Sequence, residues 1–454
     1  MNQRNNHRLV LFPLPFQGHI NPMLQLGRIL YARGFSITIL HTDFNAPNPS
    51  SHPHFAFRSI ADGLNQPQAS AADIPGLMSL LNARCASPFE ESLREIVMSL
   101  QGGEAAPVAG LISDAMFNFT CGVAERLKVR ALVLRTGGAA SLYVYSIYPI
   151  FKEKGYVPVY GSRSQEAVKE FPPLLVGDIP AEDPKKPEAI FRILDDMVKT
   201  INNSGGVILN TFEELDHQNL VSLQEVFAVP FFPIGPSHKR CGASSSSSLL
   251  AEDRSCISWL DEQPPRSVIY VSFGSIAAVS ETETLEISLG LACSEQPFLW
   301  VVRPGSAHDP EWLEKSPSRF LEALKGRGKM VKWAPQTEVL AHPAVGAFWT
   351  HSGWNSTLES ISEGVPMLCM PCFADQGVNA RYVSDVWRVG LHLNGGLERE
   401  NIARAIKRLL VEREGEEMRE RTLVLKEKAS ACLRQGGSSY QALDALVNHI
   451  LSST

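Results

Sequence analysis

The chain has 454 residues, of which 44% are hydrophobic and 20% charged, and its formal net charge is −6 at pH 7. This length and composition predict two or three globular domains with substantial cores. The sequence contains no long basic run, which argues against nucleic acid as a partner because phosphate backbones are bound by clustered Lys and Arg.

The sequence also lacks the usual signals for secretion, membrane insertion or disulfide bonding. Its polar first residues pass directly into a short apolar run, without the apolar core and cleavage site of a secretory signal. It has no stretch of about 18 or more apolar residues, so no membrane-spanning helix is expected. The eight cysteines have no regular spacing, and the single Cys-X-X-Cys sequence, Cys369 to Cys372, is either a redox or zinc pair or the end of a buried strand. We therefore expect a cytoplasmic protein.

The first half of the chain alternates β-rich runs with helical stretches. A short β-rich run over 8–13 is followed by a loop, and Asn21 and Pro22 are expected to open a helix as its cap and first residue. This helix is expected to stop at Gly34, and a strand follows over 35–41. Strand, helix and strand in this order predict a parallel βαβ unit. Further strands are expected at 108–113, 131–136 and 206–210.

A break in the pattern separates the two halves. Region 233–254 contains Ile234-Gly235-Pro236 and five consecutive serines, 244–248, which predict a flexible linker or surface loop. A last apolar helix is expected over 438–451, after two glycines. Between these two regions the alternation restarts, with strands expected at 267–273, 297–302, 329–333, 345–350 and 365–370.

These elements predict an α/β fold of two doubly wound, Rossmann-like domains that are joined by a linker and face a cleft. We expect the first domain over 1–240 and the second over 250–431. The final helix, 438–454, can pack on either domain. No Gly-X-Gly-X-X-Gly sequence follows the first strand of either half, which argues against a dinucleotide-dependent oxidoreductase.

The most informative segment is the expected strand-to-helix turn around Gly353. The helix that follows is expected to run to about Gly364. Its N-terminus presents unpaired backbone N–H groups and the positive end of the helix dipole. His351, Asn355 and Ser356 add donors that suit a pyrophosphate. The alternative is an ordinary capped turn whose Ser and Asn satisfy the helix end.

Two neighbouring loops carry further candidates. Trp333 follows one strand, where its indole can either stack on a flat base or belong to the core. Asp375 and Gln376 follow another strand and suit a hydroxyl-rich ligand, unless they are simply a polar loop. In an open parallel sheet these strand ends face one crevice, so base, phosphates and sugar can lie across successive loops.

A second group of candidates lies in the first half. His19, beside Gly18, follows the first strand, and Asp114 follows the strand expected at 108–113. In one parallel sheet both emerge at the same edge, where an imidazole can take a hydroxyl proton while a carboxylate holds its other N–H. A sugar acceptor needs such a base, whereas a nucleoside diphosphate leaves readily once its charge is met. A structural histidine and a helix-capping aspartate are the alternatives.

Segment 333–376 closely resembles, without a gap, the signature box of the plant UDP-dependent glycosyltransferases, which are GT-B enzymes of small-molecule metabolism. Segments 15–22 (PFQGHINP) and 111–114 (LISD) resemble the family's base-bearing loop and acid-bearing strand end. The resemblance covers essentially the whole chain, and it implies that the final helix, 438–454, packs back on the first domain. The opening, 11–45, is most similar to the subgroup with steviol-glycoside and benzoxazinoid glucosyltransferases.

The resemblance implies a transferase that uses a UDP-sugar as co-substrate, with Gln376 favouring glucose. His19 would be the general base, oriented by Asp114, of a single displacement that inverts the anomeric centre and yields a β-glucoside. No Asp-X-Asp pair is placed to hold a diphosphate-bound cation, so we expect no metal and no other cofactor. From base to sugar, the implied donor-binding residues are Trp333, Ala334, Gln336, Glu359, Ser275, His351, Gly353, Asn355, Ser356, Trp354, Asp375 and Gln376.

By analogy, the acceptor is expected in the first domain's half of the cleft. Candidate walls at 75–88, 137–143 and 191–197 mix small, aliphatic and aromatic residues, which suggests a planar or terpenoid-like alcohol, phenol or acid. Amphipathic core packing is the alternative for each stretch. We expect a monomer that contacts its acceptor at Gly18, Ser141, Met197 and Ala374.

Three other functions compete with sugar transfer. A glycoside hydrolase needs two opposed carboxyl groups and a path for water, which a His–Asp pair does not supply. A non-catalytic UDP-sugar-binding protein would use the same cradle, and the presence of His19 and Asp114 argues against it. An NAD-linked dehydrogenase would carry the glycine fingerprint that this chain lacks.

Overall fold

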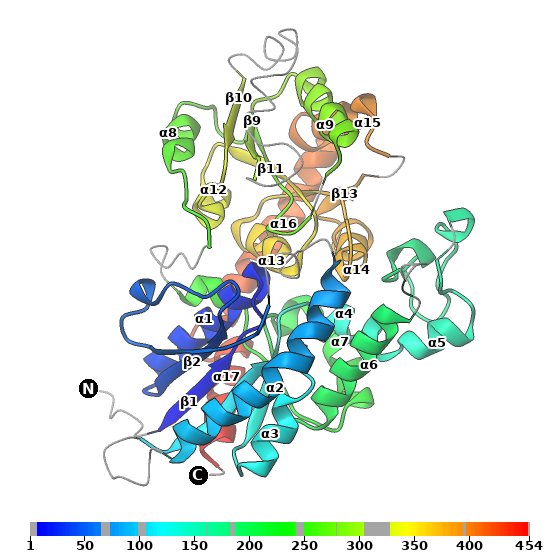
Figure 1. Ribbon diagram of the computed structural model, residues 1–454. Helices are drawn as coiled ribbons and strands as arrows, with labels where there is room; N and C mark the ends of the chain where they lie inside the picture. The colour runs from blue at the N-terminus through cyan, green and yellow to red at the C-terminus, as the bar shows by residue number, and fades with distance from the viewer. Residues whose placement is uncertain are drawn as a thin grey trace. The chain divides into compact units, whose positions relative to one another are not determined.

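The computed structural model describes residues 7–64, 73–98, 106–159, 161–181, 186, 188–241, 249–277, 279–303, 327–393 and 396–452 (Figure 1). The predicted linker serines, 244–248, lie outside these described residues. Within the described parts of the chain, none of the helices combines the length and the apolar character needed to cross a membrane.

The chain divides into two compact units. Unit 1 comprises residues 1–158, 181–249 and 431–454, and unit 2 comprises 159–180 and 250–430. Segment 159–180 therefore groups with unit 2, although it lies within the range 1–240 that we expected for the first domain. The last helix groups with unit 1.

Unit 1 is built on a seven-stranded, all-parallel sheet with the order β3-β2-β1-β4-β5-β6-β7. The order reverses beside β1, so that β1 and β4 form the switch point at which α/β sheets bind ligands. The strands are β1 (Arg8–Phe12), β2 (Ser36–Thr42), β3 (Ala56–Ile60), β4 (Val108–Asp114), β5 (Ala131–Arg135), β6 (Val207–Leu209) and β7 (Phe231–Pro233).

Helices cover this sheet (Figure 1). One apolar cluster joins Leu9 and Leu11 of β1 to Leu30 of the first helix and Leu446 of the last, so these two helices pack on the same face. The helices are α1 (Gln17–Ala32), α2 (Ile74–Met98), α3 (Thr120–Arg126), α4 (Ala139–Ser146), α5 (Tyr148–Glu153), α6 (Ala189–Asn202), α7 (Glu213–Val226) and α17 (Ser438–Leu451), with 3₁₀ turns η1 (Pro49–Ser51) and η6 (Ser237–Arg240).

The start of α1 corrects the sequence-based expectation. The helix begins at Gln17, so His19 lies in its first turn and not in a preceding loop. Asn21 does not cap the helix, because its Oδ1 accepts a hydrogen bond from Gln17 Nε2 at 2.7 Å, an i,i+4 pair on the helix surface. Phe16, in an extended conformation, is the N-cap residue, and Pro22 lies inside the helix. The C-terminal expectation is confirmed, because α1 ends at Ala32 just before a glycine with a φ of 96°.

Unit 2 contains a six-stranded, all-parallel sheet with the order β10-β9-β8-β11-β12-β13, which reverses between β8 and β11. Its strands are β8 (Val268–Ser272), β9 (Phe298–Val301), β10 (Gly328–Val331), β11 (Val345–Thr350), β12 (Met367–Cys369) and β13 (Gly390–His392). Its helices are α8 (Ser255–Asp261), α9 (Glu281–Ser294), α12 (Gln336–Ala341), α13 (Trp354–Glu363), α14 (Gln376–Arg381), η7 (Tyr382–Val386), α15 (Arg399–Leu410) and α16 (Arg413–Cys432), with short turns η4 (Gly161–Arg163) and η5 (Val176–Asp178).

The core of unit 2 lies around the central strands of this sheet. β11 is buried along its whole length, and Trp349 is among the largest completely buried side chains. The strand Met367–Cys369 ends in Cys369, whose thiol is buried, while Cys372 is exposed beyond it. The first cysteine of the Cys-X-X-Cys sequence is thus the end of a buried strand.

Candidate active site

Unit 1 brings His19 and Asp114 into direct contact. His19 Nδ1 lies 2.7 Å from Asp114 Oδ2, although the two residues are 95 positions apart in the sequence. The Asp114 side chain is almost completely buried, whereas 22% of the His19 side chain is exposed. A buried carboxylate that accepts the Nδ1–H holds the imidazole in one tautomer, which leaves Nε2 as the basic nitrogen.

The sheet explains why these residues meet. β1 and β4 are paired in parallel, with Phe12 opposite Ser113, so α1 and Asp114 both start from the carboxyl edge at the switch point. Asp114 Oδ1 accepts a hydrogen bond from the Met116 backbone N–H at 3.1 Å, which fixes the second oxygen. The carboxylate thus orients the histidine and also closes the turn after β4, and it does not cap a helix.

The sequence-based search missed a third member of this group. Thr136, directly after β5, places its Oγ1 3.1 Å from His19 Nδ1. Since β5 is the neighbour of β4, the three side chains come from the ends of three adjacent strands. The only available signal was a polar residue directly after a buried strand, which is too common to single out a site.

In unit 2, the loops after β8 and β11 enclose the His351 imidazole between two glycines. A Cβ atom at Gly274 would lie 2.6 Å from the ring, and one at Gly353 would lie 2.5 Å from Nε2. Gly274 also has a φ of 73°, which side chains rarely adopt. Burial lowers the pKa of His351 to about 4, although a hydrogen bond with the Ser272 backbone raises it, so the imidazole is neutral and carries one N–H.

The turn that leads into α13 is held by hydrogen bonds from the next helix. Ser352 is buried with a φ of 64°, a conformation that non-glycine residues seldom adopt. Its backbone carbonyl accepts a hydrogen bond from Asn379 Nδ2 at 3.0 Å, and Asp375 Oδ2 lies 3.3 Å from the same amide nitrogen. The loop after β11 is therefore connected to α14, the helix that begins at Gln376.

The first turn of α13 contains three of the expected donor-binding residues. Trp354 is the first residue of the helix, and its indole is buried, with its ring centroid 6.3 Å from that of Trp387. The expected contact of Trp354 with the sugar stays a prediction. Asn355 is half-buried and Ser356 is buried in the same turn. The ten-residue helix ends at Gly364, which has a φ of 76°, as the sequence predicted.

Gln336, the first residue of α12, connects this helix with β8 and α13 of unit 2. Its Oε1 accepts a hydrogen bond from the Tyr270 hydroxyl at 3.2 Å. Its Nε2 donates to Ser356 Oγ at 3.0 Å and to Glu359 Oε2 at 2.8 Å. Burial raises the pKa of Glu359 to about 7, a shift that the bond from Gln336 opposes. Three candidates that are separate in the sequence thus form one network.

The remaining donor candidates lie at the ends of other strands. Trp333 is half-buried two residues beyond β10, and its carbonyl accepts the Asp253 N–H at 2.9 Å, while Ala334 is buried. Ser275, one residue after Gly274, is half-buried in the loop after β8.

Gln376 is buried at the start of α14 and is already partly engaged. Its Oε1 accepts hydrogen bonds from the Cys372 and Phe373 backbone N–H groups at 2.8 and 3.0 Å. Only the Nε2 amide then remains for a ligand. The next residue, Gly377, touches η5 so closely that a Cβ would lie 2.7 Å from the Asp178 carbonyl oxygen.

A buried ion pair locks α14 against this turn. Arg381 Nε donates to Asp178 Oδ2 at 2.8 Å and Nη2 to Oδ1 at 3.3 Å, with 12% and 4% of the two side chains exposed. A bidentate pair of this kind is geometrically specific. Segment 159–180 therefore supports the helix that carries Gln376, a contribution that the sequence did not reveal.

Comparisons with known proteins agree with this arrangement. A family model described as "UDP-glucoronosyl and UDP-glucosyl transferase" matches residues 233–424. UDP-glycosyltransferase 76C1 of Arabidopsis thaliana is 48% identical over 99% of this chain and 98% of its own length. UDP-glycosyltransferase 76G1 of Stevia rebaudiana is 46% identical over 99% of this chain and 98% of its own length.

The chain belongs to the plant UDP-glycosyltransferase family. It is therefore a glycosyltransferase, as its resemblance to the family predicted. A solved structure of Phytolacca americana UGT2, complexed with UDP-2-fluoro-glucose and pterostilbene, superimposes with a TM-score of 0.79 at 28% identity, over 97% of this chain and 98% of that one. The predicted fold of two Rossmann-like α/β domains of the GT-B type is thereby confirmed.

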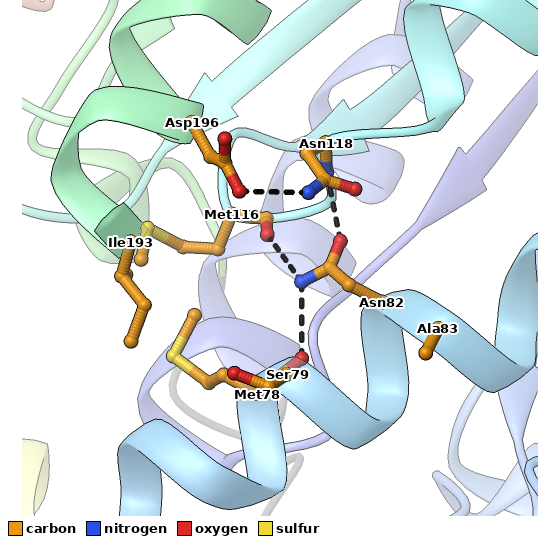
Figure 2. Close-up of a pocket in the computed structure, with 8 residues that line it drawn as sticks. All are labelled: Met78, Ser79, Asn82, Ala83, Met116, Asn118, Ile193 and Asp196. Carbon is orange, nitrogen blue, oxygen red and sulfur yellow. Dashed lines mark hydrogen bonds between the residues drawn. The ribbon is translucent and has the colours of Figure 1, made fainter. Parts of the chain in front are cut away.

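This UDP-glycosyltransferase has a pocket in unit 1, of about 340 Å³. The pocket lies between α2, α6 and the turn after β4 (Figure 2). Its apolar lining consists of Met78, Ala83, Met116 and Ile193, and its polar lining of Ser79, Asn82, Asn118 and Asp196. Most of these residues belong to two of the stretches expected as acceptor walls, 75–88 and 191–197.

The four individually expected acceptor residues do not line this pocket. Ser141 is fully buried and donates its hydroxyl to the Gly138 carbonyl at 2.9 Å, and Met197 is buried on α6. Gly18 is half-buried in the first turn of α1. Ala374 belongs to unit 2, where it is exposed with a φ of 55°.

The glycosyltransferase shows no group of three or more His, Cys, Asp or Glu side chains that could hold a metal ion within its described ranges.

Proposed function

We propose that this protein is an inverting glucosyltransferase, which transfers glucose from UDP-glucose to a hydroxyl group of a small, largely apolar plant metabolite and forms a β-glucoside. The observation that carries the proposal is the 2.7 Å contact between His19 and Asp114. Unit 1 is assigned to the acceptor and unit 2 to the UDP-sugar.

The proposed reaction is a single displacement. Nε2 of His19 takes the proton of the acceptor hydroxyl while the oxygen attacks the anomeric carbon of the sugar. The bond from that carbon to the diphosphate oxygen breaks, and UDP leaves with the electron pair. Asp114, which accepts the Nδ1–H, stabilises the imidazolium that forms. Attack on the face opposite the leaving group inverts the α-linkage of the donor.

Unit 2 supplies the groups for the donor. In the proposal Trp333 stacks on uracil, and Gln336 and Glu359 bind the uridine. The first turn of α13, with His351 and Ser275, neutralises the diphosphate. A neutral His351 suits this role because it donates a hydrogen bond without needing a proton from solvent.

The sugar is assigned to Asp375 and the Nε2 amide of Gln376. The bonds from Cys372 and Phe373 fix the orientation of this amide, because they engage its Oε1. The amide N–H₂ group can donate hydrogen bonds to oxygen atoms of the bound sugar. The hydroxyl groups of glucose provide such oxygens. Strictness for glucose over other sugars is tested by offering UDP-glucose, UDP-galactose and UDP-glucuronate with one acceptor panel and reading the products by mass spectrometry.

Metal-independent transfer is part of the proposal. The helix end and the side-chain donors of unit 2 take the charge that a cation would otherwise neutralise. Turnover in the presence of EDTA should equal turnover without it. Strong loss with EDTA that Mn²⁺ or Mg²⁺ restores would contradict the proposed phosphate site.

A non-catalytic UDP-sugar-binding role predicts a different result. The His19→Ala variant should lose transfer and keep its affinity for UDP-glucose, which calorimetry measures. If the wild-type protein binds UDP-glucose but transfers sugar to no member of a broad panel of phenols, alcohols and acids, the proposed activity is wrong.

A further inference from the structure

The pocket in unit 1 carries a single charge. Of the eight side chains that line it, four are apolar and three are neutral and polar, and only Asp196 is ionisable. No Lys, Arg or His belongs to the lining. Figure 2 shows the Asp196 carboxylate on the α6 side of the pocket, with Ile193 on the same helix and Met78 on the opposite side.

A chain of hydrogen bonds fixes this carboxylate. Asn118 Nδ2 donates to Asp196 Oδ2 at 2.9 Å, and the Asn118 backbone N–H donates to Asn82 Oδ1 at 2.8 Å. Asn82 Nδ2 in turn lies 3.1 Å from the Met78 and Met116 carbonyl oxygens (Figure 2). Both functional groups of Asn82 are thus engaged within the protein. Among the described residues, Asp196 accepts a hydrogen bond through one oxygen only, which leaves Oδ1 for a ligand.

The same chain connects the pocket to the proposed base. Met116 lines the pocket, and its backbone N–H donates to Asp114 Oδ1. An acceptor in this pocket therefore lies against the turn that orients the His19–Asp114 pair.

No cationic side chain lines the pocket beside Asp196, although Lys199 interacts with this carboxylate electrostatically from outside the lining. Lys199 pairs with Asp195, the preceding residue on α6, at 2.6 Å. Arg135, buried at the end of β5, packs over the Tyr145 ring at 5.3 Å and is not part of the lining. An anionic group in the pocket would face the like charge of Asp196, with no cation in the lining to offset the repulsion.

We propose that Asp196 makes this pocket selective for acceptors without negative charge, namely neutral or cationic molecules that offer a hydroxyl or amino hydrogen to its free oxygen. This inference rests on the proposed glucosyl transfer and narrows its acceptor class: carboxylic acids, which the sequence left open as acceptors, are disfavoured.

The test uses acceptors in matched pairs. Tyrosol, tyramine and 3-(4-hydroxyphenyl)propanoate carry the same phenol and differ at the end of a short chain, as alcohol, ammonium and carboxylate. Other phenols and alcohols are compared as primary amide and free acid. With UDP-glucose in excess, we expect kcat/KM for the uncharged or cationic member of each pair that reacts to exceed that of the acid by about tenfold or more.

The decisive variant is Asp196→Asn, with Asp195→Asn as its matched control. The new amide can still accept the bond from Asn118, so the fold is preserved while the charge is removed. Asp195 is the adjacent acid on the same helix, and it pairs with Lys199 outside the pocket. The ratio of neutral to acidic acceptor should fall severalfold or more toward one in Asp196→Asn and stay unchanged in Asp195→Asn.

The outcomes separate this inference from the proposed function. Transfer to acids as fast as to their neutral partners, or an unchanged ratio in Asp196→Asn, would overturn the charge selectivity and leave glucosyl transfer intact. An equal effect of both variants would show that the selectivity comes from general surface charge, and this result would also overturn the inference. Absence of transfer to every member of the panel would refute the activity itself, and the inference with it.

Discussion

The two units use very different stretches of sequence for their parts of the proposed site. In unit 2, most of the donor-binding candidates come from one continuous segment, 333–376, and much of the contact is expected from backbone N–H groups. In unit 1, the base and its partners come from separate strand ends, with His19 95 residues from Asp114 and 117 from Thr136. The donor candidates are encoded largely in one stretch of sequence, whereas the catalytic candidates are brought together from strand ends far apart in the chain.

This difference predicts how each half responds to mutation. In the donor half, binding of the UDP-sugar is expected from many hydrogen bonds and a helix end. Each single substitution should therefore lower the affinity for UDP-glucose only partly. The catalytic half has one proton acceptor, and its loss should remove turnover while binding persists. The following predictions test this contrast, from the largest expected effect to the smallest.

Replacing the base should have the largest effect. His19→Ala should lower kcat by about 1,000-fold or more. Among the described residues, His19 is the one side chain that bonds to Asp114 Oδ2, so no second base is oriented to replace it. Affinity for UDP-glucose, measured by calorimetry, should stay within about twofold, since His19 belongs to unit 1. Retention of more than a tenth of the wild-type rate would exclude His19 as the base.

Replacing Asp114, the carboxylate proposed to orient His19, should lower kcat somewhat less than replacing His19. Asp114→Asn preserves the shape but presents an amide to Nδ1, which disfavours the tautomer with a basic Nε2, so we expect kcat to fall about 100-fold or more. The pH–rate profile distinguishes this role from a structural one, because a poorly stabilised imidazolium shifts its basic limb. A matching loss of thermal stability with an unchanged profile would argue for structure alone.

In the donor half, the enclosure of His351 can be disturbed without removing it. Gly353→Ala places a methyl group 2.5 Å from the imidazole, so the ring or the turn must move. We expect the Kd for UDP-glucose to rise about tenfold, measured by calorimetry. Gly161→Ala is the control, because a Cβ at this position in the same unit meets nothing within 4 Å. Equal, small effects of the two variants would show that the imidazole is not tightly held.

Glu359 gives unit 2 a dependence on pH. Burial raises its pKa from 4.5 to about 7, so the folded protein binds this proton more tightly than the unfolded chain does. The resulting stability is present below about pH 4.5 and is lost as the pH rises through about 7, on the order of 3 kcal/mol. The Glu359→Gln variant should lack this part of the pH dependence in urea unfolding. Identical pH profiles for the two proteins would contradict the assignment.

The smallest effect should come from Thr136. Its hydroxyl lies 3.1 Å from a nitrogen that already bonds to Asp114, so Thr136→Val should lower kcat only about two- to fivefold. A loss as large as that of Asp114→Asn would mean that the threonine, and not the carboxylate, sets the tautomer.

Much of unit 2's site could be predicted because its signals are local. A buried strand, a glycine turn and a helix stop at Gly364 occur in one short stretch, and the structure reproduces β11 at the predicted residues 345–350. The connections between candidates could not be predicted. That Gln336 bonds both Ser356 and Glu359, or that Asp178 braces α14 through Arg381, depends on which loops meet.

The sequence by itself determined the α/β class, the central strands of both sheets, the donor segment and the family. Apolar periodicity and short motifs can be read from neighbouring residues, without knowledge of tertiary contacts. The strands it missed, β3, β7 and β13, all lie at sheet edges, where short and partly exposed runs lose the apolar signal. It also misplaced the start of α1, since Asn21 bonds to Gln17 instead of capping the helix. Only the tertiary structure decided that Thr136 joins His19, that 159–180 groups with unit 2 and that Asp196 faces the pocket, because each depends on pairing between distant strands and helices.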